Sequence, residues 1–202
     1  MRIAKVSDQE ILNGLMSVFR SKGYDGASLN ELAEATGLKK ASLYHRFPGG
    51  KKEMTDAVLD FMEAWINEKV YKVLSNREVP PQQRLKDALH NIGEVYGHGT
   101  KVCIYRSLSM DTGMSLFGKK IEKGIGQWLD SFSILGEAVG MDAATAMQWA
   151  QQNFTLDNMT VWRIRTLQRH MQHNQQHVQL VISWTAHAGM MIRTWIVPSP
   201  VP

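Results

Sequence analysis

The sequence predicts an all-α protein, and three observations lead to this prediction. Apolar residues recur at spacings of three and four over most of the 202-residue chain, whereas the alternation typical of β-strands is scarce. Helix-capping residues and glycines separate the apolar stripes. The composition, with 44% hydrophobic and 21% charged residues, suits a chain that buries a core. We expect an N-terminal three-helix domain over 5–65, joined by a long helix to a helical domain over 66–202.

The first predicted helix covers about 8–22. Ser7 or Asp8 can cap its N-terminus by accepting a hydrogen bond from a free backbone N–H group. Gly23 can end it, because glycine readily adopts the left-handed conformation. The helix carries an apolar stripe of Ile11, Leu12, Leu15, Val18 and Phe19.

Two short helices follow the first one. Ser28 and Glu31 have the spacing of a capping box, in which each side chain binds a backbone N–H group of the other residue. The second helix therefore begins at Ser28, and Gly37 breaks it. A third helix covers about 39–46 and ends before Pro48, because proline disfavours helical geometry for the residue before it.

A fourth, longer helix begins near Lys51 and can run to about residue 74. Pro80 and Pro81 mark the next break. From Gln82 onward, helical spacing of apolar residues resumes, with short breaks at glycines.

The segment 28–47 has the organisation of a helix-turn-helix. Two short helices flank a turn that contains Gly37, and the second helix has a basic N-terminal end. In this motif the first helix crosses the DNA backbone, and the second reads base edges in the major groove. We therefore predict that the chain binds double-stranded DNA.

The predicted reading helix carries side chains suited to DNA. Lys39 and Lys40 can meet phosphates or guanine acceptors, and Tyr44 can donate to a phosphate oxygen. His45 can do the same. Ala41 and Ser42 are small enough for close approach to the bases.

The positive charge is concentrated in the same part of the chain. Residues 1–52 hold nine Lys or Arg against five Asp or Glu, an excess of +4 that equals the net charge of the whole chain. Residues 53–202 balance at 14 of each sign. Lys51 and Lys52 stand at a predicted helix N-terminus, where cations are unfavourable, so an anionic partner there would explain them.

The N-terminal pattern resembles the DNA-binding domain of TetR-type regulators. The resemblance covers about 7–65, and its most characteristic part is Tyr44-His45-x-Phe47. The run Pro48-Gly49-Gly50-Lys51 is similar to the LmrA/YxaF-like branch of the family. The other matching positions are Phe19, Gly23, Tyr24, Ser28, Leu32, Ala33, Gly37, Leu38 and Leu43.

The resemblance implies a function as well as a fold. It implies a repressor without enzymatic activity that binds a near-palindromic operator as a homodimer and leaves it when a small effector binds. The second domain would be helical and would hold both the dimer interface and the effector pocket. The residues that would touch DNA are Ser28, Lys39, Lys40, Ala41, Ser42, Tyr44, His45 and Lys51.

The middle of the chain is rich in aromatic and methionine side chains, which suit an adaptable apolar pocket. We therefore expect a small hydrophobic effector and no cofactor. The candidate pocket residues are Tyr96, Tyr105, Met110, Phe117, Trp128 and Trp149.

A different class of function rests on the C-terminal tail. His170, His173 and His177 would share one face of a helix, and two of them could bind a metal ion, as in a helical metal-binding protein or enzyme. No cysteine or carboxylate lies within ten residues to complete such a site. We therefore favour the regulator and assign no metal site and no catalytic residue.

The tail after residue 150 departs from the rest of the chain in composition. Residues 151–202 contain no lysine and one acid. Natural divergence and a change of reading frame near residue 150 both account for this pattern, and we favour divergence. The apolar run 178–197 predicts a dimer helix rather than a membrane span, because it contains costly polar residues.

The predicted location is the cytoplasm. The first residues lack the apolar core of a signal peptide. Cys103 is the only cysteine, so an intramolecular disulfide is impossible, and we expect a small buried hydrophobe rather than a redox sensor.

Overall fold

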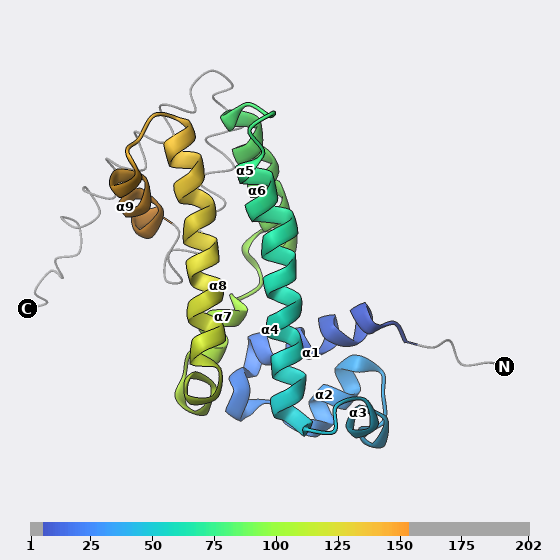
Figure 1. Cartoon of the computed structure of the whole chain (residues 1–202). Helices are drawn as coiled ribbons and strands as arrows, with labels where there is room; N and C mark the ends of the chain where they lie inside the picture. Colours follow the sequence, from blue (N-terminus) through green and yellow to red (C-terminus); the bar gives the residue numbers. More distant parts are fainter. Residues whose placement is uncertain (1–5, 154–202) are drawn as a thin grey trace, which may run out of the picture. The chain divides into compact units, whose positions relative to one another are not determined.

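The computed structural model describes residues 6–153, and within that range all its regular secondary structure is helical (Figure 1). The predicted all-α class is confirmed. The predicted dimer helix at 178–197 and the histidines of the tail lie outside the described residues. No helix within 6–153 is long and apolar enough to span a membrane.

The chain forms two compact units. The first contains residues up to Glu68 together with Thr100–Gln127. The second contains Lys69–Gly99 and, of the described residues, 128–153.

The first unit begins with α1 (Asp8–Gly26). Its N-cap is Ser7, which forms a capping box with Glu10. The helix buries Ile11, Leu15 and other residues of the predicted apolar stripe. Its backbone leaves helical geometry at Gly23, with φ 67° and ψ −171°. The helix is therefore interrupted at the residue predicted to end it, and a short helical segment continues to Gly26.

Helices α2 (Leu29–Thr36) and α3 (Lys40–Arg46) follow α1 closely. Gly14 explains how α1 and α2 come together. A Cβ atom at this position would lie 2.3 Å from the carbonyl oxygen of Ala35, a distance that real Cβ atoms do not show. The absence of a side chain at residue 14 is therefore what allows this packing.

The fourth helix is close to its predicted length but is not uniform. The α-helix α4 (Gly50–Ile66) passes into a π-helical turn, Asn67–Tyr71, and then into α5 (Lys72–Ser75). The helical run thus starts in the first unit and ends in the second.

Two further helices complete the first unit. They are α7 (Ile104–Leu108) and the first part of α8 (Asp111–Ala138). Ion pairs join α8 to α4: the ammonium group of Lys120 lies 3.0 Å from Asp56 and 2.7 Å from Asp60. Lys123 and Glu63 add a pair at 2.6 Å.

The second unit contains α5, α6 (Pro81–Val95), the short 3₁₀ turn Gly97–Gly99, the rest of α8, and α9 (Ala143–Asn153). The predicted proline break falls at the start of α6, where Pro81 occupies the first turn. Arg84 is almost fully buried, and its guanidinium donates to the carbonyl oxygen of Leu74 at 2.8 Å. This bond satisfies a carbonyl group at the C-terminal end of α5.

Candidate nucleic-acid interface

Local sequence fixes the turn between α2 and α3. The Ser28 hydroxyl accepts from the Glu31 backbone N–H at 3.3 Å, and the Glu31 carboxylate accepts from the Ser28 backbone N–H at 3.0 Å. At the other end of α2, Gly37 adopts the left-handed conformation with φ 65°. The Leu38 backbone N–H then donates to the carbonyl oxygen of Ala33 at 3.1 Å. The turn therefore uses the backbone groups that the helix end leaves free.

Buried apolar side chains hold the two helices in place. Leu32 and Leu43 are fully buried, Ala33 is buried, and Leu38 is half-buried. Because Leu43 is the inward-facing residue of α3, the rest of that short helix is left at the surface.

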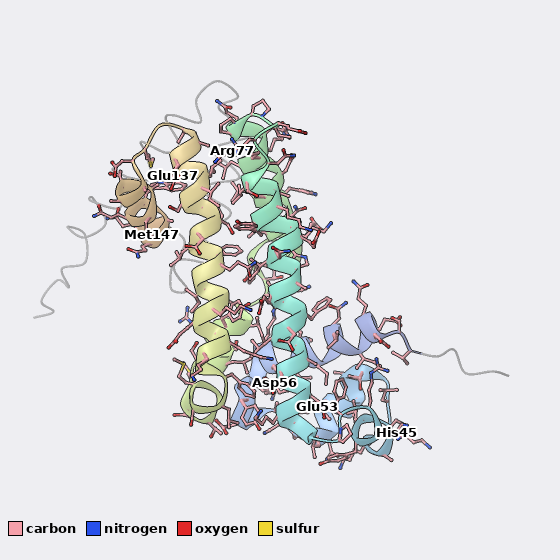
Figure 2. All side chains as sticks on the ribbon, viewed as in Figure 1. His45, Glu53, Asp56, Arg77, Glu137 and Met147 are labelled. Atoms are coloured by element: carbon pink, nitrogen blue, oxygen red, sulfur yellow. The ribbon has the colours of Figure 1, made fainter. Side chains whose placement is uncertain are left out.

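Seven of the eight residues predicted to touch DNA are exposed. The Tyr44 side chain is 44% exposed, a high value for an aromatic residue, and it lies near Gly50 at the start of α4. Figure 2 shows His45 pointing away from the ribbon on α3. The seven residues are Ser28, Lys39, Lys40, Ala41, Ser42, Tyr44 and His45.

The eighth residue, Lys51, is placed differently. It is half-buried, and its ammonium group donates to the carbonyl oxygen of Ala27 at 3.2 Å. The same group lies 4.6 Å from the centre of the Tyr24 ring, within the range of a cation–π contact. Lys51 therefore joins the start of α4 to the C-terminal end of α1, whatever it does toward DNA.

The electrostatics of this surface favour an anion. Lys39 and Lys40 are exposed and form no ion pair within residues 6–153. Nearby acids are engaged: Glu53 accepts from the Gly49 backbone N–H at 2.6 Å. Hydrogen bonds from Ser28 lower the pKa of Glu31, which also lies 3.5 Å from the ammonium group of Lys22.

The six candidate effector residues are divided between the two compact units. Tyr96, Trp128 and Trp149 belong to the second unit and are buried. Tyr105 and Phe117 belong to the first unit and are also buried, and burial raises the pKa of the Tyr105 hydroxyl. Met110, in the first unit, is 66% exposed.

The sequence predicts no role for Tyr24 beyond its place in the family pattern. The ring of Tyr24 packs edge-on against Phe117 with ring centres 5.4 Å apart. The same ring forms the cation–π contact with the ammonium group of Lys51. Lys52 pairs with Asp56 at 3.0 Å instead of standing free. Tyr24 is 27 residues from Lys51 and 93 residues from Phe117, so no local pattern could have found this cluster, whereas the Lys52–Asp56 pair has the i,i+4 spacing of a local contact.

Known proteins match the N-terminal part of the chain in sequence and most of the chain in fold. Residues 11–58 match the family model described as bacterial regulatory proteins, tetR family. The chain is similar to the HTH-type transcriptional regulator LmrA of Bacillus subtilis strain 168, with 34% identity over 64 residues. That match spans 32% of this chain and 34% of LmrA, so it covers about a third of each protein.

Solved structures resemble the fold over most of the chain. A TetR transcriptional regulator from Legionella pneumophila has a TM-score of 0.67 at 17% identity, covering 93% of this chain and 99% of that one. The regulator FadR from Bacillus subtilis, solved in complex with stearoyl-CoA, has a TM-score of 0.54 at 14% identity, covering 95% and 100%.

The fold and the N-terminal motif together define a class: an all-helical protein that carries a helix-turn-helix. Within that class the N-terminal domain of the chain, over residues 11–58, is of the tetR type. These comparisons do not favour the alternative of a metal-binding protein or enzyme.

Proposed function

We propose that the chain is a DNA-binding transcriptional regulator that acts as a repressor from a near-palindromic operator. The observation that carries this proposal is the outward-facing surface of α3. It holds two lysines with no ion pair within the described residues, on a turn that two caps and a buried leucine make rigid. The match of residues 11–58 to the tetR family supports it.

Each side chain of this surface has a proposed role. Ala41 and Ser42 let α3 enter the major groove, and Lys39 and Lys40 bind phosphates or guanine acceptors there. Ser28 together with Tyr44, His45 and Lys51 contacts the phosphate backbone and fixes the register of the helix. Such contacts position the protein, whereas base contacts choose the sequence.

The proposed assembly is a homodimer in the cytoplasm, with one α3 helix in each half-site. Half-sites would then be about 34–36 Å apart, or a multiple of that distance. We assign the dimer interface to the C-terminal part of the 66–202 domain, on the family resemblance.

We further propose that a small hydrophobic effector controls the operator affinity. The helical run from Gly50 to Ser75 begins beside the DNA surface and continues into the second unit, so it could carry a shift between them. A coupling of about 1–3 kcal/mol would change operator affinity roughly 5–150-fold, and operator DNA would change effector affinity equally. FadR is a regulator solved with a fatty-acyl thioester, which supports an apolar ligand for this fold.

Selection of binding sites from a random duplex library tests the proposal. Enriched sequences should contain two related half-sites, and Lys40→Ala should weaken binding to the selected duplex and make its salt dependence shallower by about 1. Lys119→Ala is the matched control, because Lys119 is an exposed lysine of α8. Failure to enrich any sequence, or equal effects of the two variants, would refute the DNA surface proposed here.

A further inference from the structure

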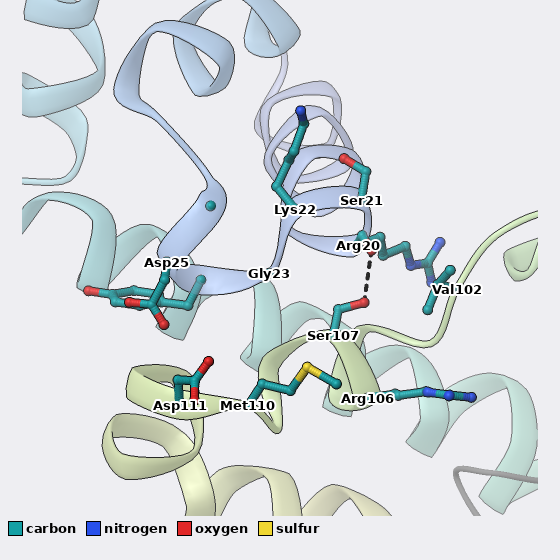
Figure 3. Close-up of a pocket in the computed structure, with 12 residues that line it drawn as sticks. Arg20, Ser21, Lys22, Gly23, Asp25, Val102, Arg106, Ser107, Met110 and Asp111 are labelled. Carbon is teal, nitrogen blue, oxygen red and sulfur yellow. Dashed lines mark hydrogen bonds between the residues drawn. The ribbon is translucent and has the colours of Figure 1, made fainter.

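The first compact unit contains a cavity of about 420 Å³ (Figure 3). One wall is the C-terminal part of α1, with Arg20 and Lys22, and the other is the segment of α7 and its link to α8, with Arg106 and Met110. Its volume lies within the range of small-molecule sites. None of its residues is among the eight predicted to touch DNA. Of the six candidate effector residues, only the exposed Met110 lines it.

Hydrogen bonds across the cavity hold its two walls together. The Ser107 hydroxyl donates to the carbonyl oxygen of Arg20 at 2.8 Å (Figure 3), and the Thr112 backbone N–H donates to the Asp25 carboxylate at 3.3 Å. At Gly23, φ is 67° and a Cβ atom would lie 3.0 Å from the Ser107 carbonyl oxygen. The walls are therefore held in place by the protein itself, without a ligand.

The backbone is also strained on one rim. Asp111, which lines the cavity, has a φ of 44°, a conformation that residues other than glycine rarely adopt. Strain of this kind persists only where the surrounding structure imposes it, and it is concentrated at functional sites.

The charges that line the cavity are not equally available to a ligand. Asp25 already binds the start of α8, and Asp111 lies in the first turn of α8, where the helix dipole stabilises a carboxylate. Lys22 is paired with Glu31. Arg106, in contrast, is exposed and has no ion pair within residues 6–153, and Arg20 lines the same cavity. The lining as a whole holds three cations, Arg20, Lys22 and Arg106, against two carboxylates, Asp25 and Asp111, so its net charge is +1.

Apolar side chains lie beside these arginines. Val102 is 51% exposed and Met110 is 66% exposed, and both line the cavity. Figure 3 draws both among the residues that line the cavity, with Met110 on the link between α7 and α8. Methionine adapts its shape to irregular apolar partners, so this surface suits the hydrocarbon part of a ligand.

We propose that this cavity binds a small organic anion, a carboxylate or a phosphate ester that carries an apolar group. The planar guanidinium of Arg106 would hold the anionic group through paired hydrogen bonds, and the positive charge of Arg20 lines the same cavity. Val102 and Met110 would be covered by the apolar group. Of the six candidate effector residues only Met110 belongs to this site, and the site does not depend on DNA binding.

Four probes separate the contributions of charge and apolar surface: 4-phenylbutyrate, phenyl phosphate, the neutral 4-phenylbutanol, and inorganic phosphate. The full chain is labelled with ¹³C at the methionine methyl groups and titrated without DNA. The Met110 signal is assigned by Met110→Leu, and Met147 of the second unit serves as the internal reference.

We expect at least one of the two apolar anions to shift the Met110 signal but not the Met147 signal. Inorganic phosphate and the alcohol should bind at least tenfold more weakly than that anion. Arg106→Gln, on α7, should weaken binding of that anion at least tenfold. Lys119→Gln removes an exposed charge on α8, outside the cavity lining, and should leave binding unchanged. The proposal is overturned if neither anion shifts Met110 at millimolar concentration, if the alcohol binds equally well, or if Arg106→Gln leaves the affinity unchanged.

Discussion

Replacing Lys51 by alanine tests two roles of this residue, one in the stability of the fold and one in DNA binding. In the structure the Lys51 ammonium donates to Ala27 at 3.2 Å and lies 4.6 Å from the Tyr24 ring centre. A hydrogen bond from a charged donor contributes about 1.5–3 kcal/mol when buried, and an exposed cation–π contact about 0.5–1 kcal/mol. Because Lys51 is half-exposed, the lower ends of both ranges apply, and Lys51→Ala should reduce the free energy of unfolding by about 2 kcal/mol.

An effect on DNA binding should appear beside this loss of stability. An ammonium group has three donors, and Ala27 takes one of them, so a phosphate can still be bound. Losing one phosphate contact makes the slope of log affinity against log salt concentration shallower by about 0.9. The effect should be nearly equal for operator and unrelated duplexes, because phosphates carry no sequence information.

Urea unfolding and salt-dependent fluorescence anisotropy measure the two effects independently. Tyr24→Leu keeps the charge of Lys51 and removes the ring, so it should lower stability without changing the salt slope. Lys40→Ala should do the reverse. A stability of Lys51→Ala within about 0.3 kcal/mol of the original protein would refute the structural role, since surface substitutions without partners have effects of that size. An unchanged salt slope would remove Lys51 from the DNA surface.

Two further predictions concern packing and charge in the first unit. Gly14→Ala should lower the free energy of unfolding by about 1–2 kcal/mol in urea, because the new Cβ meets backbone of Ala35 and overpacking outweighs the gain in helix propensity. Gly118→Ala, where a Cβ meets only the flexible end of a methionine at 3.5 Å, should instead be neutral or stabilising. Burial raises the pKa of Asp56, but hydrogen bonds from Lys120 and a neighbouring lysine outweigh it and leave this pKa below its usual value. The double-mutant cycle of Asp56→Asn and Lys120→Gln should therefore give a coupling of about 0.5–1 kcal/mol at pH 7. This coupling should be lost as the pH falls through the lowered pKa of Asp56, since a carboxyl with a lowered folded pKa stabilises the fold only while it is ionised. A coupling that is unchanged at a pH where Asp56 is fully protonated would contradict the ion pair.

The elements that local rules determine could be predicted from the sequence. Ser28 and Glu31 define the start of α2 through contacts three residues apart, and Gly37 ends the helix because it can adopt a positive φ. The burial of Leu43 follows from the same helical spacing, and it leaves the neighbouring positions of α3 exposed. The predicted DNA surface depends on these short-range features, so seven of its eight residues are found exposed as expected.

Side chains whose partners lie far along the chain could not be predicted in this way. At the sequence level Lys51 is a cation at a helix N-terminus, which suggests an anionic partner. Its partners in the structure, Ala27 and Tyr24, are 24 and 27 residues earlier and become neighbours only when α1 and α4 pack. The division of the aromatic effector candidates between two compact units has the same origin, because composition alone does not say which unit a residue joins.

The proposed anion cavity is the feature that the sequence predicts least, because the residues that close it lie far apart along the chain. The residues that close it, Arg20 with Ser107 and Asp25 with Thr112, are 87 positions apart in each pair. Gly23 looks like an ordinary helix terminator in the sequence, yet in the structure it is also the point where α1 approaches Ser107 closely enough to form a wall. Gly23 thus has two roles, one in ending the helix and one in forming the cavity wall. Only the role in the wall depends on a distant segment, the one that contains Ser107. Gly23→Ala should accordingly do more than strain the end of α1: by pushing against Ser107 it should open the cavity and weaken any anion bound there.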